Sequence, residues 1–328
     1  AYNTYINSYN ANMISNEVFI DSATLRENVV ALARNIGYTP RSTTAAKAIV
    51  SFFVDTTDFA TKPVTLTLKK GIVATSASVF GSESYSFCIP TDVTVPVVDG
   101  IATFSNVTIY EGTFLTTNFT VSSENPAPPT KYILQNPNID TSTVEVIVRD
   151  TQASTSSKKF VFSDTLIEVT STSRVYFLQE IEDQRYELIF GDGVFGEALE
   201  SLNFIEVSYI TTHGDVANNI SSFSFNGRIV DNNNNLVSTG ISVITTINDS
   251  IGGKAIESVD SIKRYAPKIY STYNRAVTAA DYEALIPKVY PETESVSVFG
   301  GEEMSPPRYG KVFITIKPFY GPYVPDSI

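Results

Sequence analysis

Apolar residues recur with a helical period near the N-terminus and with strand-like alternation over most of the remaining chain. Between Leu25 and Ile36 they are spaced four, three and four residues apart, which places them on one face of an α-helix. Ser22 is a suitable N-cap, and Gly37, with a proline three residues later, is a typical stop signal. The pattern predicts an amphipathic helix over residues 23–36.

Short runs of alternating apolar and polar residues predict β-strands from residue 43 to residue 225. Asp99 and Gly100 form the strongest hairpin signal, because this pair tolerates the left-handed backbone of a two-residue turn. The run from Asp231 to Asn235 predicts a loop tip, since Asp and Asn side chains compete with backbone pairing. Residues 45–53 match the helical spacing as well as the strand pattern. The predicted strands cover residues 48–54, 64–68, 85–89, 93–98, 101–109, 114–121, 143–149, 159–162, 175–181, 186–190, 204–211 and 220–225.

The stretch from residue 252 to residue 290 carries the clearest helix punctuation, and it predicts two short helices joined by an extended connector. Ser258 is positioned to cap the first helix, with Asp260 in the first turn, where a helix N-terminus favours negative charge. Pro267 removes a backbone donor and is expected to end this helix. The connector is then expected to run from Lys268 to Val277.

Thr278 opens the second helix of this stretch, and Asp281 stands three residues later as a variant of the capping box. An apolar stripe that runs from Tyr282 to Val289 predicts one buried face. Pro287 is expected to kink or end the helix. Residues 294–299 and 311–317 then alternate as a strand pair.

These elements predict an α+β fold: a β-rich multi-domain chain with an N-terminal helix and a C-terminal unit of two helices plus a strand pair. Residues 1–13, rich in Asn and Tyr without a period, are expected to be an arm or linker. The Ser- and Pro-rich residues 122–130 are a plausible module boundary. We therefore expect three domains: an N-terminal helix and β-rich module (1–122), a middle β-rich domain (130–250) and a C-terminal α+β unit (251–328).

The charge balance argues against nucleic acid and anionic membrane as partners. The formal net charge is −12, from 23 Lys and Arg against 35 Asp and Glu, and both kinds of partner need a basic surface. No segment has the features of a membrane span or a signal peptide. The single cysteine, Cys88, excludes an intramolecular disulfide and fits a reducing compartment. A buried apolar thiol is favoured over a nucleophile there.

The run Gly191, Asp192, Gly193 resembles a ligand-binding loop in composition. A phosphate loop would need a following helix and usually a lysine, and a calcium loop would need more acids at alternating positions. The sequence supplies neither. A structural turn is the favoured interpretation.

No catalytic, cofactor-binding or metal-binding residue is predicted, and we expect no enzyme and no small-molecule substrate. His213 is the only histidine, and with one cysteine it cannot complete a zinc site. Catalysis at His213 would need an acid and a nucleophile that the sequence does not nominate. A carboxylate pair could serve glycoside hydrolysis, but the acidic cluster is better explained as a solvated hairpin tip; its members are Glu180, Glu182, Asp183 and Glu187.

Arg275 lies in the expected connector, close in sequence to two carboxylates of the second helix. A phosphate could bind to its guanidinium group. An ion pair with Asp281 or Glu283, which would hold the connector against the helix, is the favoured interpretation.

Long motifs stand in the C-terminal part and in the middle of the chain. The C-terminal motifs are GGKAIESVDSIKRYAP, YNRAVTAADYEALIPKVYPETESVSVFGGEE and YGKVFITIKP. Together they resemble the baseplate J-like family, the wedge components of contractile phage tails and related injection machines. Upstream, YFLQEIEDQRYELIFGDGVFGEAL and FIEVSYITTHGDVANN are similar to the larger T-even phage version. The residues taken as the structural signature are Asn274, Arg275, Thr278, Asp281, Tyr282, Gly191, Asp192 and Gly193.

This resemblance implies a structural protein of the virion tail baseplate, assembled in the host cytoplasm. It implies self-association, most simply as a two-fold dimer, and binding to other wedge proteins in a ring around the hub. The family continues beyond the strand pair, so the chain is expected to be a fragment. A carbohydrate-binding or adhesin module of a tail or surface protein is the alternative, favoured by the many Tyr and Asn residues and disfavoured by the absence of Trp.

Overall fold

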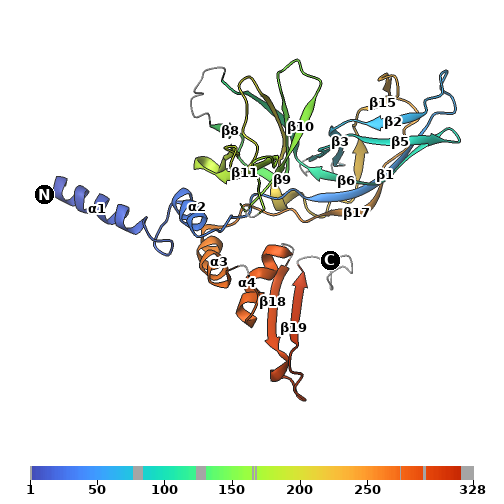
Figure 1. Ribbon diagram of the computed structural model, residues 1–328. Coiled ribbons are helices and arrows are strands. Elements are labelled where there is room, and N and C mark those ends of the chain that lie inside the picture. The colour runs from blue at the N-terminus through green and yellow to red at the C-terminus, as the bar shows by residue number, and fades with distance from the viewer. Residues whose placement is uncertain are drawn as a thin grey trace. The chain divides into compact units, whose positions relative to one another are not determined.

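The computed structural model describes residues 2–76, 84–122, 131–164, 166, 168–273, 275–290 and 293–318 (Figure 1). The chain forms two compact units. The terminal unit combines Ala1–Arg41 with Glu257–Ile328, and the β unit is Ser42–Ile256. Helices dominate the former and strands the latter, so the expectation of a mostly β α+β chain is met. In the described part of the chain, no helix is long and apolar enough to span a membrane.

The described residues of the terminal unit form four helices and one antiparallel strand pair. The helices are α1 (Tyr2–Asn16), α2 (Arg26–Asn35), α3 (Val259–Thr272) and α4 (Ala279–Val289), and the strands are β18 (Thr293–Gly300) and β19 (Val312–Pro318), linked through the short η3 (Gly301–Glu303). A small core joins α2 to α3, because Val29, Val30 and Ala33 bury against Ile262 and Ala266. The strand pair predicted near the C-terminus is confirmed.

Residues 2–13, expected to be an arm or linker, belong to the helix α1, which the sequence did not predict. The helix carries no acidic residue in its first turn and no basic residue in its last turn. Its apolar residues also lack a helical period, so neither of the usual signals marked it.

The start of α2 differs from the prediction, because Ser22 does not cap it. The Ser22 hydroxyl instead donates to the carbonyl oxygen of Asn16 at 2.6 Å, and the helix begins at Arg26. The Glu17 carboxylate accepts from the backbone N–H of Thr24 at 2.8 Å and from the side-chain amide of Asn28 at 2.8 Å. A carboxylate just beyond the end of α1 therefore satisfies the entry to α2, which favours negative charge.

This capping role predicts that the stability of the fold decreases only at acidic pH. The hydrogen bonds from Thr24 and Asn28 lower the pKa of Glu17 from 4.5 to about 2. A lowered folded pKa stabilises the fold above pH 4.5, and this stabilisation is lost as the pH falls toward 2. We expect the NMR signal of the Glu17 carboxyl carbon to titrate near pH 2. In Glu17→Gln, the loss of hydrogen-exchange protection that acid causes at the first-turn amides of α2 should disappear. A midpoint near 4.5 would contradict the capping role.

Neither proline ends its helix, so the stop predicted at Pro267 is wrong, and of the two effects expected at Pro287 the helix end is not found there. Pro267 lies inside α3, which continues to Thr272, and Pro287 lies inside α4, which continues to Val289. Each proline costs a backbone hydrogen bond, but in α3 Ile269 and Thr272 beyond the proline are buried. Packing therefore offsets the loss, and residues 268–272 of the expected connector are helical.

The buried face of α4 is also narrower than predicted. Val289 is 81% exposed, whereas Ala284 is buried. Tyr282 and Leu285 are half-buried. The apolar stripe therefore packs only in the middle of the helix, where α4 meets β18.

The β unit contains a ten-stranded and a seven-stranded sheet, each with its own core. Neighbours in the larger sheet follow the order β14-β3-β4-β6-β5-β2-β15-β16, and β1 pairs with β6 and β17. Its strands are β1 (Lys47–Asp55), β2 (Thr65–Leu68), β3 (Gly71–Ser76), β4 (Ser86–Ile89), β5 (Val93–Val98), β6 (Ile101–Glu111), β14 (Phe223–Phe225), β15 (Ile229–Asp231), β16 (Leu236–Val237) and β17 (Thr245–Ile251).

The smaller sheet has the order β7-β13-β9-β10-β11-β12-β8, and among its described strands only β10 and β11 pair in parallel. Its strands are β7 (Thr113–Thr120), β8 (Tyr132–Leu134), β9 (Ile139–Arg149), β10 (Ser157–Phe162), β11 (Val175–Glu180), β12 (Tyr186–Phe190) and β13 (Phe204–Thr211), and two short helical turns are η1 (Glu182–Gln184) and η2 (Gly214–Ala217).

The predicted strands are largely confirmed, and β5, β12 and β13 have the predicted bounds. Asp99 and Gly100 turn the β5–β6 hairpin with φ values of 51° and 82°, as the sequence pair requires. The loop after Asp231 is the tip between β15 and β16. Residues 45–53, which also matched helical spacing, contribute to strand β1. Of the proposed boundary at residues 122–130, residues 123–130 lie outside the described residues.

Candidate functional site

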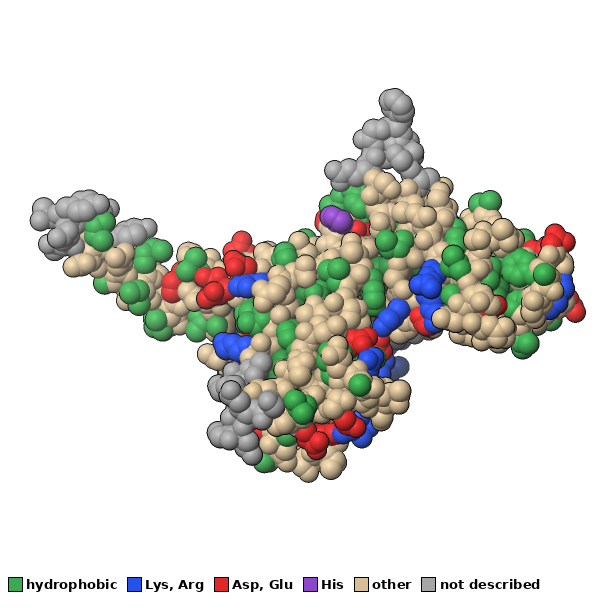
Figure 2. Space-filling view, turned by 90° about the horizontal axis from the view of Figure 1, so that it is seen from above, with side chains coloured by type: hydrophobic (Ala, Val, Ile, Leu, Met, Phe, Trp, Pro, Cys, Tyr) green, Lys and Arg blue, Asp and Glu red, His purple; other side chains and the backbone are tan. Residues whose placement is uncertain are grey.

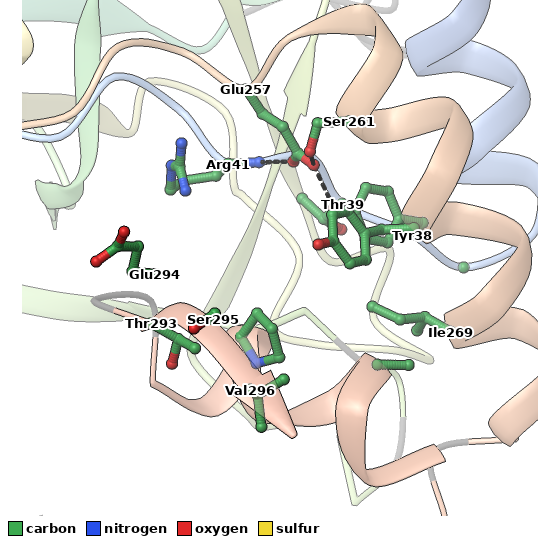
Figure 3. A pocket seen from close by; sticks show the side chains of 14 residues that line it. Tyr38, Thr39, Arg41, Glu257, Ser261, Ile269, Thr293, Glu294, Ser295 and Val296 are labelled. Carbon is green, nitrogen blue, oxygen red and sulfur yellow. Dashed lines mark hydrogen bonds between the residues drawn. The ribbon is translucent and has the colours of Figure 1, made fainter. Parts of the chain in front are cut away.

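A pocket of about 390 Å³ lies in the terminal unit, between the segment after α2, the start of α3 and the α4–β18 region (Figure 3). Its residues come from both ends of the sequence. They are Gly37, Tyr38, Thr39, Arg41, Glu257, Ser261, Tyr265, Ile269, Ala284, Pro287, Thr293, Glu294, Ser295 and Val296.

Glu257 forms the polar wall of this pocket and is only 6% exposed. Its Oε1 accepts hydrogen bonds from the Tyr38 hydroxyl at 2.7 Å and the Ser261 hydroxyl at 2.6 Å. Its Oε2 accepts from the backbone N–H of Arg41 at 3.0 Å. The residue directly precedes Ser258, the N-cap of α3, where the helix dipole favours negative charge. One carboxylate thus fastens the segment after α2 to α3.

Tyr38 stays a hydrogen-bond donor in this arrangement. Burial, and then the charge of Glu257, raise the pKa of the Tyr38 phenol far above its ordinary value. The hydroxyl therefore remains protonated across the physiological range. It holds the carboxylate in place and does not act as a base.

The opposite side of the pocket is apolar, and its rim is polar. Ile269, Pro287 and Val296 supply the apolar surface. The Arg41 side chain points away from the Glu257 carboxylate, toward the rim that carries Glu294 (Figure 3). Glu294 is itself paired with Lys317 at 2.6 Å, and Lys317 lies opposite Ser295, the next residue along β18.

The predicted capping box at the start of α4 is confirmed. The Thr278 hydroxyl accepts from the backbone N–H of Asp281 at 3.3 Å, and the Asp281 carboxylate accepts from the backbone N–H of Thr278 at 2.8 Å and of Val277 at 3.1 Å. The Thr278 backbone hydrogen bond is the main cause that lowers the pKa of Asp281. This pair of residues is therefore architectural.

Removing the cap should loosen the start of α4. We expect Thr278→Ala to reduce the local stability of the helix by about 1 kcal/mol, whereas Thr278→Ser should retain it, because serine keeps the accepting oxygen. Hydrogen exchange of the Asp281 and Tyr282 amides measures the difference. Equal exchange rates in Thr278→Ala and the parent chain would contradict the capping role.

The ion pair expected at Arg275 is absent from the described residues. Asp281 is engaged in the cap, and the Glu283 carboxylate accepts from the backbone N–H of Val298 at 3.3 Å, which ties α4 to β18. The Arg275 side chain is exposed, and its backbone N–H donates to Thr272 at 2.9 Å. Asn274 lies outside the described residues, and Tyr282 is half-buried in α4.

Gly191, Asp192 and Gly193 form a self-contained turn after β12, as predicted. The Asp192 carboxylate accepts from the backbone N–H of Val194 at 2.9 Å and of Phe195 at 2.8 Å, and these bonds lower its pKa. Gly193 has a φ of 87°. A β-carbon at Gly191 would overlap the backbone of Gly196. Only glycine therefore allows the two backbone segments to lie this close together.

His213 contacts a carboxylate that the sequence did not nominate. Glu111, completely buried at the end of β6, accepts from the Thr212 hydroxyl at 2.5 Å and the His213 backbone N–H at 3.0 Å, and its Oε1 lies 2.6 Å from His213 Nδ1. The histidine side chain is 67% exposed and is visible at the surface in Figure 2. The two residues are 102 positions apart, so no local signal could have joined them.

The Cys88 thiol close to this carboxylate–histidine pair is not an activated nucleophile. Burial, and then the charge of Glu111, raise the pKa of the Cys88 thiol to about 12, so the thiol stays protonated. Its Sγ instead contacts the carbonyl oxygens of Tyr110 and Gly112, each at 3.5 Å. Across the described ranges, no three His, Cys, Asp or Glu side chains are grouped to hold a metal ion.

The acidic cluster is the tip of a hairpin, as predicted. Glu180 and Glu187 lie in the antiparallel strands β11 and β12, while Glu182 and Asp183 belong to η1 between them. Arg185 pairs with Asp183 at 3.4 Å, and the Asp183 side chain is largely exposed.

Comparisons with known proteins give two family matches in different parts of the chain. Residues 278–327 match the baseplate structural protein gp6, C-terminal domain I. Residues 124–219 match the bacteriophage baseplate wedge protein gp6, third domain. The former begins at the Thr278 cap of α4, and the latter includes β8 to β13 of the smaller sheet.

One curated relative and one solved structure are also similar to this chain. The baseplate wedge protein gp6 of Enterobacteria phage T4 is 26% identical over 351 residues, covering 99% of this chain and 49% of the relative. The chain thus spans about half the length of that relative. A chain in the cryo-EM structure of the anti-feeding prophage (AFP) baseplate is 15% identical, with a TM-score of 0.30, covering 83% of this chain and 48% of that chain, a similarity too low to carry an argument.

The two domain matches occur in one chain, and the T4 relative aligns with nearly all of it. All three matches are to baseplate proteins of bacteriophages. Together they support a structural role for this chain in a T-even-like baseplate wedge, in the tail baseplate of the virion.

Proposed function

We propose that this chain is part of a baseplate wedge subunit that forms the inner ring around the hub of a contractile tail. The subunit self-associates and binds other wedge proteins, and it works through these contacts without catalysis. The observation that carries the proposal is the presence of two gp6 domain matches in one chain. The motifs over residues 252–317 support a further assignment to the baseplate J-like group.

The carboxylates described above also favour a structural role. Glu257 and Glu111 each accept hydrogen bonds from residues far away in the sequence and hold segments of their own unit together.

Self-association can be tested with the purified chain by sedimentation velocity over a wide concentration range. We expect a dimer whose fraction rises with concentration, as an isologous two-fold contact requires. Co-sedimentation with the other wedge proteins of the same phage tests the second set of contacts. A chain that stays monomeric and binds none of them would overturn the proposal.

A further inference from the structure

We propose that the terminal-unit pocket receives a lysine or arginine side chain from a partner protein, with Glu257 as its counter-ion. The partner would be another protein of the proposed assembly, so its identity rests on the proposed function. The preference of the pocket for a long basic side chain does not depend on the proposed function, because it follows from the residues that line the pocket.

The first argument is a buried charge without a counter-ion. Glu257 is nearly inaccessible, and its three hydrogen bonds come from neutral donors: two hydroxyls and one backbone N–H. Within the described residues, no lysine or arginine forms an ion pair with it. Buried carboxylates are ordinarily paired with a cation. A carboxylate also accepts about four hydrogen bonds, so one position remains for an incoming donor.

The second argument is the charge of the lining. The lining includes the carboxylates of Glu257 and Glu294 and the guanidinium group of Arg41, but Glu294 is already paired with Lys317, so Glu257 is the carboxylate left to attract a ligand. Arg41 reaches Glu257 through its backbone N–H, while its side chain points away (Figure 3). An anionic ligand would be repelled by the Glu257 carboxylate, whereas a cation would be attracted to it.

The third argument is the shape of the site. A volume of about 390 Å³ lies near the lower end of small-ligand pockets, which is too small for a helix and suits one long side chain. Ile269, Pro287 and Val296 can cover the alkyl stem of lysine or arginine, while Glu257 holds the charged head. Long basic side chains combine these two properties, and a purely apolar side chain would leave the carboxylate unpaired.

The test uses the whole chain with labelled Ile and Val methyl groups and two free probes, arginine amide and citrulline amide. Citrulline has nearly the shape of arginine without the charge. We expect saturable methyl shifts at Ile269 and Val296 with arginine amide, and binding of citrulline amide weaker by about tenfold or more. No saturable shift with arginine amide, or equal binding of both probes, would overturn the inference.

Variants assign the response to the pocket. Glu257→Gln should weaken arginine amide binding by about tenfold, and Glu303→Gln, an exposed acid outside the lining, should leave it unchanged. If Glu257→Gln does not fold, Ser295→Phe decides, because Ser295 is exposed at the pocket and a large ring there should block entry. Undiminished binding in Ser295→Phe would place the probe elsewhere. Failure here leaves the sedimentation test of the proposed function untouched, since that test contains no added ligand.

Discussion

Replacing Gly112 with alanine should lower the free energy of unfolding of the β unit by about 3 to 5 kcal/mol. Gly112 has a φ of 127°, a backbone conformation that alanine adopts only with strain. A β-carbon there would also overlap the carbonyl oxygen of Thr211 and lie 2.8 Å from Ile210 Cγ2. The residue joins β6 of the larger sheet to β7 of the smaller one, so relief of the clash would disturb the β7–β13 pairing. Urea unfolding followed by circular dichroism measures the loss.

Gly71→Ala is the matched control. Gly71 has a similar φ of 113°, but a β-carbon there would meet nothing within 4 Å. Only the backbone strain remains, and we expect a loss of about 1 to 2 kcal/mol. The difference between the variants isolates the overlap with Thr211. Equal losses would show that the close approach at Gly112 is easily relieved.

Replacing Glu257 with alanine should lower the local stability of the terminal unit by about 3 kcal/mol. The change leaves the Tyr38 hydroxyl, the Ser261 hydroxyl and the Arg41 N–H without their acceptor, and each orphaned buried donor costs about 1 to 3 kcal/mol. Relief from burying a charge offsets part of this cost. Hydrogen exchange of the amides of α2 and α3 reports the loss, because these helices pack against each other.

Two further variants define the cause. Glu257→Gln keeps one accepting oxygen but turns an amide donor toward one of the existing donors, so we expect a smaller loss than for alanine. Glu303→Ala removes an exposed carboxylate of the same unit and should change nothing measurable. Unaltered exchange in Glu257→Ala would show that water replaces the lost acceptor.

The features that were predicted correctly are those that depend on residues close together in the sequence. Alternation located most strands, because one face of each strand is buried in a sheet core. Asp99 with Gly100 fixed a hairpin, and Thr278 with Asp281 fixed a helix start. In the hairpin and the helix start, the residues that interact are at most three positions apart, so the short motif contains all the information that the prediction needs.

The remaining features depend on contacts that the linear pattern does not contain. Tyr38 and Glu257 are 219 positions apart, and only the folded terminal unit brings them together. Pro267 is tolerated because α3 is buried beyond it, which a local rule about proline cannot include. The N-terminus of α2 is satisfied from Glu17, in the turn after α1, although Ser22 stands closer in sequence.

The discontinuous terminal unit has a consequence for the order in which the protein folds on the ribosome. The β unit is inserted between Arg41 and Glu257, and its ends are held together where Thr44 and Lys254 exchange backbone hydrogen bonds at 2.9 and 3.0 Å. During synthesis α2 leaves the ribosome before the β unit, yet its partner α3 follows only after the whole β unit. The core that α2 shares with α3 therefore cannot form until the β unit has been synthesised.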